Sequence, residues 1–423
     1  MPATDLRTAT GAILPAAEHF GAALLFLLAG AVGLVWVAPE LASGNFLAPR
    51  VAGVTHLFTL GWLTTTIFGA LHQLLPVALS APVRWPRVGH ASIAAFAPGV
   101  ALFAAGVATN GAVLHHAGIA LVTTGVVLSI ANFGATLARA PKRDLTWWAV
   151  ALALGALAST LLLGVALLHN LHTGFLAEAR LRLLAIHLHV ALVGWALLVI
   201  VGMSQRLLPM FLLAHGVDAR WGRRAVALLA AGTIVLALGL ALRVRWLAWT
   251  GTAMLDGGVV AFLVQARAFY RHRVRRKLDA GMRFAATALV FLAAAATLGP
   301  VVLATAPARP RIASAYLLAG LLGGIVLYVV GHFYKIVPFL AWVARYRDRM
   351  GRESVPTVAD LYSARVATVQ WGVMTAGVGA LVAGTLAGHA HCARVGALLF
   401  AAGTSMLAAQ GARIALGIHR PSA

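Results

Sequence analysis

The sequence predicts an all-α transmembrane protein of about twelve helices, built from three pseudo-symmetric four-helix repeats. Composition is the first observation behind this prediction: of 423 residues, 61% are apolar and 10% are charged, and the mean hydropathy is +0.89. An ordinary soluble domain is about 45–50% apolar and about 25% charged. The composition therefore excludes a disordered chain and almost any soluble enzyme. The single cysteine, Cys392, excludes an internal disulfide and a cysteine-based zinc or iron–sulfur site.

Charge-poor stretches long enough to cross a bilayer follow one another along the whole chain, which is the second observation. We expect helices at about residues 12–37, 51–80, 89–109, 112–138, 146–169, 183–213, 224–242, 246–268, 282–304, 312–342, 362–387 and 393–417. The seventh is short, and its limits can be drawn differently. The first begins too early, and continues too directly into the bundle, to look like a cleaved signal peptide. We expect one membrane domain, residues 1–423.

The basic residues are distributed unevenly between the loops. Loops that follow even-numbered helices hold 18 Lys and Arg residues, whereas loops that follow odd-numbered helices hold 8. Because basic loops are retained in the cytoplasm, this excess predicts that both termini are cytoplasmic. The protein is then expected in the lipid of a bacterial cytoplasmic (inner) membrane, and its net charge of +22 requires no nucleic-acid partner.

An internal repeat is the third observation. Without gaps, and at an offset of 133 residues, HLFTLGWLTTTIFGALHQLLP (residues 56–76) aligns with HVALVGWALLVIVGMSQRLLP (residues 189–209), with eight of 21 positions identical. A third copy, 129 residues further on, retains Gly323, Gly331 and Pro338. The copies fall on the second, sixth and tenth helices, which predicts repeats at about 1–144, 145–280 and 281–423. Chance similarity in a chain rich in Gly, Ala and Leu is the alternative.

Three histidines near the outer ends of the second and sixth helices are the leading candidates for cofactor binding. His56 and His189 occupy the same repeat position, and His187 lies two residues before His189. Residues two apart on a helix do not share a face, so His187 and His189 are expected to serve two sites rather than one metal. The alternative is that all three imidazoles are bonded to neighbouring backbone or water.

Further ionisable groups are weaker candidates. His72 and His332 lie nearer the cytoplasm and could bind a metal, although a structural role is favoured. Asp256 lies midway along the eighth helix, where an ionisable group is a candidate proton relay or ion ligand, or a structural residue bonded to a neighbouring helix. A group expected near the outer loops, either solvated or forming a copper or haem-edge site, consists of His115, His116, His169, His172, His389, His391 and Cys392.

These features resemble subunit I of the haem–copper oxidase superfamily, and the segment 189–209 is similar to the sixth helix of its C-type and nitric-oxide-reductase-like branches. The resemblance implies haem b, with His56 as an axial ligand and His187 or His189 as a second haem or copper ligand. The sequence departs from the family, because residues 224–242 contain no histidine and Tyr316 and Leu318 stand where the family has His-x-His. The chain therefore looks more like the divergent haem- and copper-binding relatives linked to the nitric-oxide response.

Three functions remain open at this point. The first is a redox protein that binds haem, with or without copper, transfers electrons, or binds or reduces NO or O2; its electron donor would be a protein or a quinol. The second is a non-redox transporter or sensor of copper, haem or a small solute on the same scaffold. The third is an assembly or partner subunit of a respiratory complex. A proton-pumping oxygen reductase is not expected, because the family's three-histidine copper centre cannot be assembled.

Overall fold

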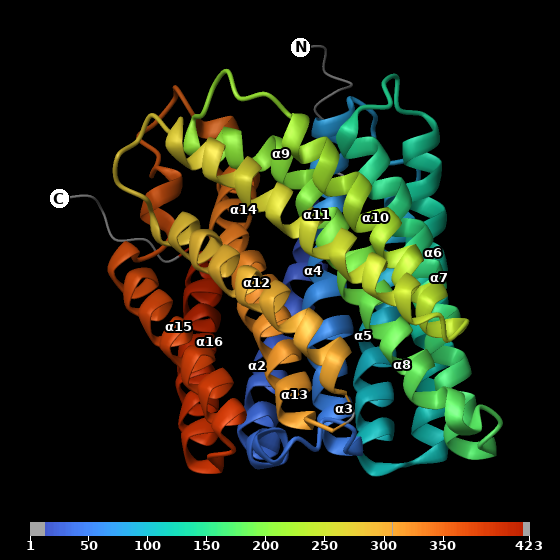
Figure 1. Cartoon of the computed structure of the whole chain (residues 1–423). Helices are drawn as coiled ribbons and strands as arrows, with labels where there is room; N and C mark the ends of the chain where they lie inside the picture. Colours follow the sequence, from blue (N-terminus) through green and yellow to red (C-terminus); the bar gives the residue numbers. More distant parts are fainter. Residues whose placement is uncertain (1–12, 307, 418–423) are drawn as a thin grey trace.

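The computed structural model describes residues 13–306 and 308–417, and twelve of its helices are long and apolar enough to cross a membrane (Figure 1). The protein is an integral membrane protein, as predicted. Within the described ranges there is no β-strand. The spans are α2 (Ile13–Ser43), α3–η1–α4 (Pro49–Leu79), α5 (Pro86–Thr109), α6 (Ala112–Ala138), α7 (Leu145–Thr173), η2–α8–η3–α9 (Ala177–Leu212), α10 (Arg220–Ala241), α11 (Arg245–Arg271), α12 (Ala280–Thr305), α13–η4–α14–η5 (Pro310–Arg349), α15 (Ala364–Ala387) and α16 (Ala390–Leu416).

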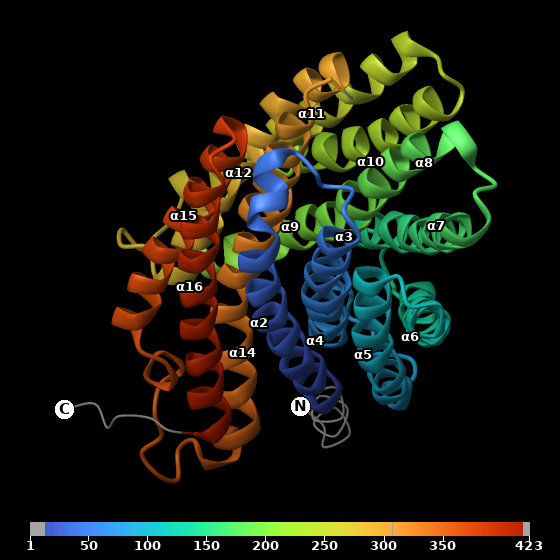
Figure 2. The ribbon, with the colours of Figure 1, turned by 90° about the horizontal axis from the view of Figure 1, so that it is seen from below.

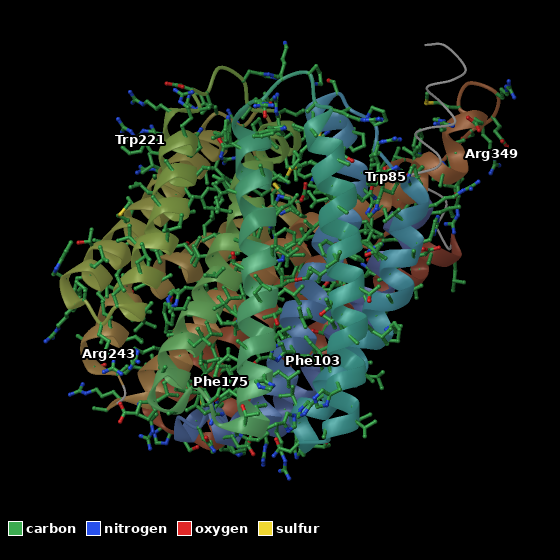
Figure 3. The ribbon with its side chains drawn as sticks, turned by 90° about the vertical axis from the view of Figure 1, so that its right-hand side faces the viewer. Trp85, Phe103, Phe175, Trp221, Arg243 and Arg349 are labelled. Atoms are coloured by element: carbon green, nitrogen blue, oxygen red, sulfur yellow. The ribbon has the colours of Figure 1, made fainter. Side chains whose placement is uncertain are left out.

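Helix α2 begins, and helix α16 ends, on the same side of the bundle, which we call the terminal side; the opposite end is the far side. Figure 3 shows Trp85 and Trp221 towards the terminal side and Phe103 and Phe175 towards the far side. Which side faces the cytoplasm remains the prediction made from the basic loops. A short 3-10 helix, η6 (Val358–Leu361), lies in the polar loop that follows α14.

The bundle repeats one arrangement of helices. Three antiparallel hairpins, α5–α6, α10–α11 and α15–α16, lie at three sides of the molecule, and α16 packs against α2 (Figure 2). The second and tenth spans are the most buried, with 67% and 78% of an apolar 18-residue stretch of each inside the protein; the sixth span, like α5, has half of such a stretch buried. These three spans carry the repeated sequence.

Each of these inner spans contains a π-helical segment in the same place. Segment η1 (Leu57–Thr64) lies between α3 (Pro49–His56) and α4 (Thr65–Leu79). Segment η3 (Val190–Leu197) lies between α8 (Arg180–His189) and α9 (Leu198–Leu212). Segment η4 (Ala319–Val326) lies between α13 (Pro310–Leu318) and α14 (Leu327–Tyr346). Their first residues are separated by 133 and 129 residues, the two offsets that relate the sequence copies. Segment η3 contacts both η1 and η4. The repeat boundaries themselves stay a prediction.

The repeated glycines allow close helix packing. In each π segment one glycine lies against the first helix of its own repeat, and a Cβ on Gly61 would lie 2.6 Å from Phe26 on α2. The equivalent Gly194 and Gly323 face α7 and α12. A larger residue at these positions would push apart two helices that are in contact.

A polar contact on the terminal side also recurs. Asp144 and Asp279 accept hydrogen bonds from the backbone at the starts of α7 and α12, where they act as N-caps. Asp144 also pairs with Arg206, at 2.5 Å, and Asp279 pairs with Lys335. Arg206 and Lys335 each lie three residues before the repeated proline. The repeat thus includes an ion pair between two of its helices.

Candidate functional site

A cavity of about 270 Å³ lies in the far half of the bundle, lined mainly by the first and second repeats and also by α13 and η4 of the third. This volume is near the lower end of small-molecule pockets, which span about 300–1,000 Å³. Leucine, valine and phenylalanine side chains form most of its wall, including Phe103 of α5 (Figure 3). The polar residues that line it are Thr55, His56, Thr59, Thr64, Thr160, Arg180, His187, Trp195 and Ser314.

His56, the last residue of α3, lines this cavity and has one ring nitrogen outside the backbone hydrogen bond. Its Nδ1 donates a hydrogen bond to the Ala52 carbonyl, 2.7 Å away. A carbonyl can only accept, so the proton is on Nδ1 and Nε2 carries the lone pair. The ring contacts Phe103 edge to face, with centroids 5.0 Å apart. His56 therefore presents an oriented, neutral imidazole that could bind iron or copper.

His187 lines the same cavity from α8. Its Nδ1 is buried and has no hydrogen-bond partner. Gly164 of α7 lies beside the ring, because a Cβ at that position would be 3.3 Å from His187 Cε1. The cavity is thus bordered by two imidazoles, one from each of two repeats.

His189 has different neighbours from His187. Its Nδ1 donates to the Ala185 carbonyl at 2.8 Å, so Nε2 is free to accept a hydrogen bond from the Tyr316 hydroxyl at 3.1 Å. The two rings are stacked, with centroids 6.1 Å apart. His187 and His189 therefore have different neighbours, and their service of two sites stays a prediction.

Asp256 of α11 belongs to the same second environment. A Cβ on Gly299 of α12 would lie 3.9 Å from Asp256 Oδ1 and 3.8 Å from Tyr316 Cε2. The carboxyl group and the tyrosine ring therefore border one glycine, and the hydroxyl of the same tyrosine bonds His189. From the sequence, Tyr316 is only a tyrosine at a position where the family has a histidine. Its hydrogen bond to His189 was not predicted.

The two environments are related by the repeat. His56, His189 and Leu318 occupy one register position, and His187 and Tyr316 occupy another, two residues earlier. His56 of the first repeat shares its cavity with His187 of the second, and His189 of the second bonds Tyr316 of the third. Leu318 provides an apolar side chain where a third histidine would stand, and it also lines the cavity.

His72 and His332 do not lie together. The ring of His332 stacks on Tyr328, with centroids 4.4 Å apart, and also contacts Phe211. His332 borders a separate, almost wholly apolar cavity of about 70 Å³. His72 instead lies beside His19, a residue outside the repeated segments.

The far-side histidines lie at helix ends. His115 is buried at the start of α6, and the ring of His172, from the last turn of α7, contacts both His115 and His116, with centroids 5.6 Å and 5.2 Å away. His389 caps α16 at a different place, and Cys392 in its first turn is exposed. The expected outer group is therefore divided between two locations.

Across the part of the chain that the structure describes, no three or more His, Cys, Asp or Glu side chains are arranged to hold one metal ion. The metal ligands expected at His72, His187, His189 and His332 thus form no common centre of three. Two imidazoles that line one apolar cavity supply the kind of ligand that holds an axially ligated haem. A three-histidine copper centre does not fit these residues.

The comparisons with known proteins bear on the fold. No family model matches the chain, and no curated protein matches it. A cryo-EM structure of a haem–copper terminal oxidase dimer is similar over 100% of this chain and 85% of that chain, with a TM-score of 0.64 and 13% sequence identity. The twelve-helix fold expected from the resemblance is therefore confirmed, and at this identity the likeness concerns the fold alone.

Proposed function

We propose that this protein is a haem-binding membrane redox protein, with one haem b held between His56 and His187 in the far-half cavity. The observation that carries the proposal is that these two imidazoles, from equivalent helices of adjacent repeats, line one apolar cavity. The similarity of the whole fold to a haem–copper terminal oxidase supports it.

The residues of the chain would prepare the site in three ways. The Ala52 carbonyl fixes the tautomer and the direction of the His56 ring. The apolar wall excludes water, and Gly164 gives the His187 ring its space. A bound haem would supply a one-electron redox centre whose potential depends on its axial ligands and its burial.

The second environment would handle protons rather than hold a haem. The Tyr316 hydroxyl donates a hydrogen bond to His189 Nε2, and the Asp256 carboxyl borders the same glycine, Gly299, as the tyrosine ring. Ionisable groups at this depth in a membrane protein commonly form proton relays. We propose Asp256, Tyr316 and His189 as such a relay beside the haem. NO or O2 as the diatomic ligand, and a quinol or protein as the electron donor, remain proposals from the resemblance.

The test compares His187→Ala with His189→Ala, two variants that differ by two positions on one helix. We expect one haem per chain in the wild type, because the cavity presents one pair of imidazoles. His56→Ala and His187→Ala should lose the haem, whereas His189→Ala should retain it. The measurement is a reduced-minus-oxidised visible spectrum of detergent-purified protein, with the haem-to-protein ratio. Full haem in both cavity variants, or a featureless spectrum from haem-sufficient cells, contradicts the proposal.

A further inference from the structure

A second pair of histidines lies on the terminal side, away from the far-half cavity. It consists of His19 on α2 and His72 on α4, which we call the inner histidine pair. Both side chains are buried, with exposed fractions of 0% and 1%. Their ring centroids are 5.3 Å apart, and the ring planes are tilted by 37°. Two buried imidazoles thus lie side by side inside the membrane domain.

Hydrogen bonding fixes the same tautomer in both rings. Nδ1 of His19 donates to the Pro15 carbonyl at 2.6 Å, and Nδ1 of His72 donates to the Phe68 carbonyl at 2.8 Å. Each Nε2 therefore carries a lone pair, and both Nε2 atoms are buried without a hydrogen-bond partner. A buried acceptor without a partner costs about 1–3 kcal/mol, and here two occur side by side. An electron-pair acceptor between them would remove both penalties.

The backbone of α5 packs closely against the free nitrogen of His72. A Cβ on Gly89 would be 2.6 Å from His72 Nε2 and 3.0 Å from the Cβ of Pro15. Any larger residue at this position would therefore collide with the imidazole and displace it. Glycine is thus the residue that lets His72 keep its unpaired nitrogen beside His19.

We propose that the inner histidine pair is a two-coordinate binding site for monovalent copper, Cu(I). Imidazole nitrogen suits copper and zinc, whereas hard cations prefer oxygen ligands. Both ligands are neutral, and their ring neighbours are aromatic, since Phe133 contacts His72 and Phe68 contacts His19. The cost of burying a charge increases steeply with its size, so this site favours a monovalent over a divalent ion.

A polar pair at the surface lies next to this site. Glu18 directly precedes His19, and its Oε2 is 2.7 Å from Nδ1 of His90, one residue after Gly89. The side chains of His90 and Glu18 are 41% and 46% exposed. A carboxylate and an imidazole at the rim could receive a cation from the terminal side. Glu18 and His90 would thus connect the buried nitrogens with the solution.

The experiment measures metal binding to the full-length purified protein. Cu(I), kept reduced with ascorbate, and Ag(I), a redox-inert analogue, are titrated against a competing chelator. We expect one equivalent of either ion in the wild type. His19→Ala and His72→Ala should each lower the affinity by at least about tenfold, the lower end of what loss of even an outer-shell partner costs. Gly89→Ala should lower it similarly while both imidazoles are retained.

Two matched controls separate this site from general effects on folding. His332 is also buried, with Nδ1 bonded to the Tyr328 carbonyl and Nε2 without a partner, but its ring neighbours are Phe211 and Tyr328. His332→Ala should therefore retain the binding. Gly21→Ala should also retain it, because a Cβ on Gly21 meets nothing within 4 Å.

The results that would overturn the proposal are equally specific. They are the absence of bound Cu(I) or Ag(I) in the wild type, equal affinity for Zn²⁺, or an equal loss of binding in His332→Ala. The haem proposal fails independently, because haem content is measured on the same samples and depends on His56 and His187. Haem should stay at the wild-type ratio in His19→Ala and His72→Ala.

Discussion

Gly164 is the single residue whose size most directly controls the space beside His187. A Cβ there already approaches the ring to 3.3 Å, so the longer side chain in Gly164→Leu should occupy the cavity and push the imidazole aside. Overpacking of this kind costs about 1–3 kcal/mol, and about 1.4 kcal/mol is tenfold in affinity. We expect haem affinity to fall by about tenfold or more, measured by haem titration of the apoprotein.

Gly155 provides the control for this variant. It lies nine residues earlier on the same helix, and a Cβ there meets nothing within 4 Å. Gly155→Leu should therefore bind haem like the wild type. Equal affinity of the two leucine variants would show that the cavity is not where haem binds.

At the scale of single residues, the helix face on which a side chain lies was predictable from the sequence, whereas its partner on another helix was not. The spacing of His187 and His189 was enough to separate their environments, because the geometry of one helix decides it. Tyr316 as the partner of His189, and His19 as the partner of His72, join residues 127 and 53 positions apart in the chain. No local pattern marks such pairs, because they depend on how helices from different parts of the chain are packed.

At the scale of elements, the π-helical segments are linked by one side-chain hydrogen bond. Trp195 Nε1 in η3 donates to Thr64 Oγ1 in η1, at 3.2 Å in a buried environment. Thr64→Val removes the acceptor and leaves the indole N–H buried without a partner, which costs about 1–3 kcal/mol. We expect a lower thermal midpoint of unfolding in detergent, measured by tryptophan fluorescence.

Thr66, two residues later, gives the comparison. Its hydroxyl is buried without a partner, so Thr66→Val removes an unpaired polar group rather than a hydrogen bond. Its thermal midpoint should equal or exceed that of the wild type. If Thr66→Val were as destabilising as Thr64→Val, the contact between η1 and η3 would not be the cause.

The elements themselves were largely predictable, because a membrane span must be long and apolar. The fourth helix was expected at 112–138 and is found at Ala112–Ala138, whereas the sixth was expected from residue 183 and begins at Ala177. The early start arises because the amphipathic turn around Arg180 is helical although it is charged. The π segments were not predicted, since they change the hydrogen-bond register without changing composition.

At the scale of the whole molecule, the three repeats share packing but differ in polar chemistry. The glycine contacts of the inner helices recur in all three repeats, and the Asp–cation pair recurs in the second and third. The polar register positions differ instead. The first and second repeats bring together His56 and His187, the second and third bring together His189 and Tyr316, and the third has Leu318 where a histidine would stand. A symmetric scaffold thus provides one candidate cofactor cavity and one candidate proton relay, at two different repeat interfaces.

The orientation of this asymmetric bundle in the membrane can be tested with its single cysteine. Cys392 is exposed in the first turn of α16, on the far side, and the excess of basic residues in the terminal-side loops predicts that the far side is outside. A membrane-impermeant maleimide should therefore label Cys392 in intact bacterial cells. In a Cys392→Ser background, Glu353→Cys places a thiol in the exposed terminal-side loop, which should react only after permeabilisation. The reverse pattern would invert the topology, and the cavity lined by His56 and His187 would then lie in the cytoplasmic half.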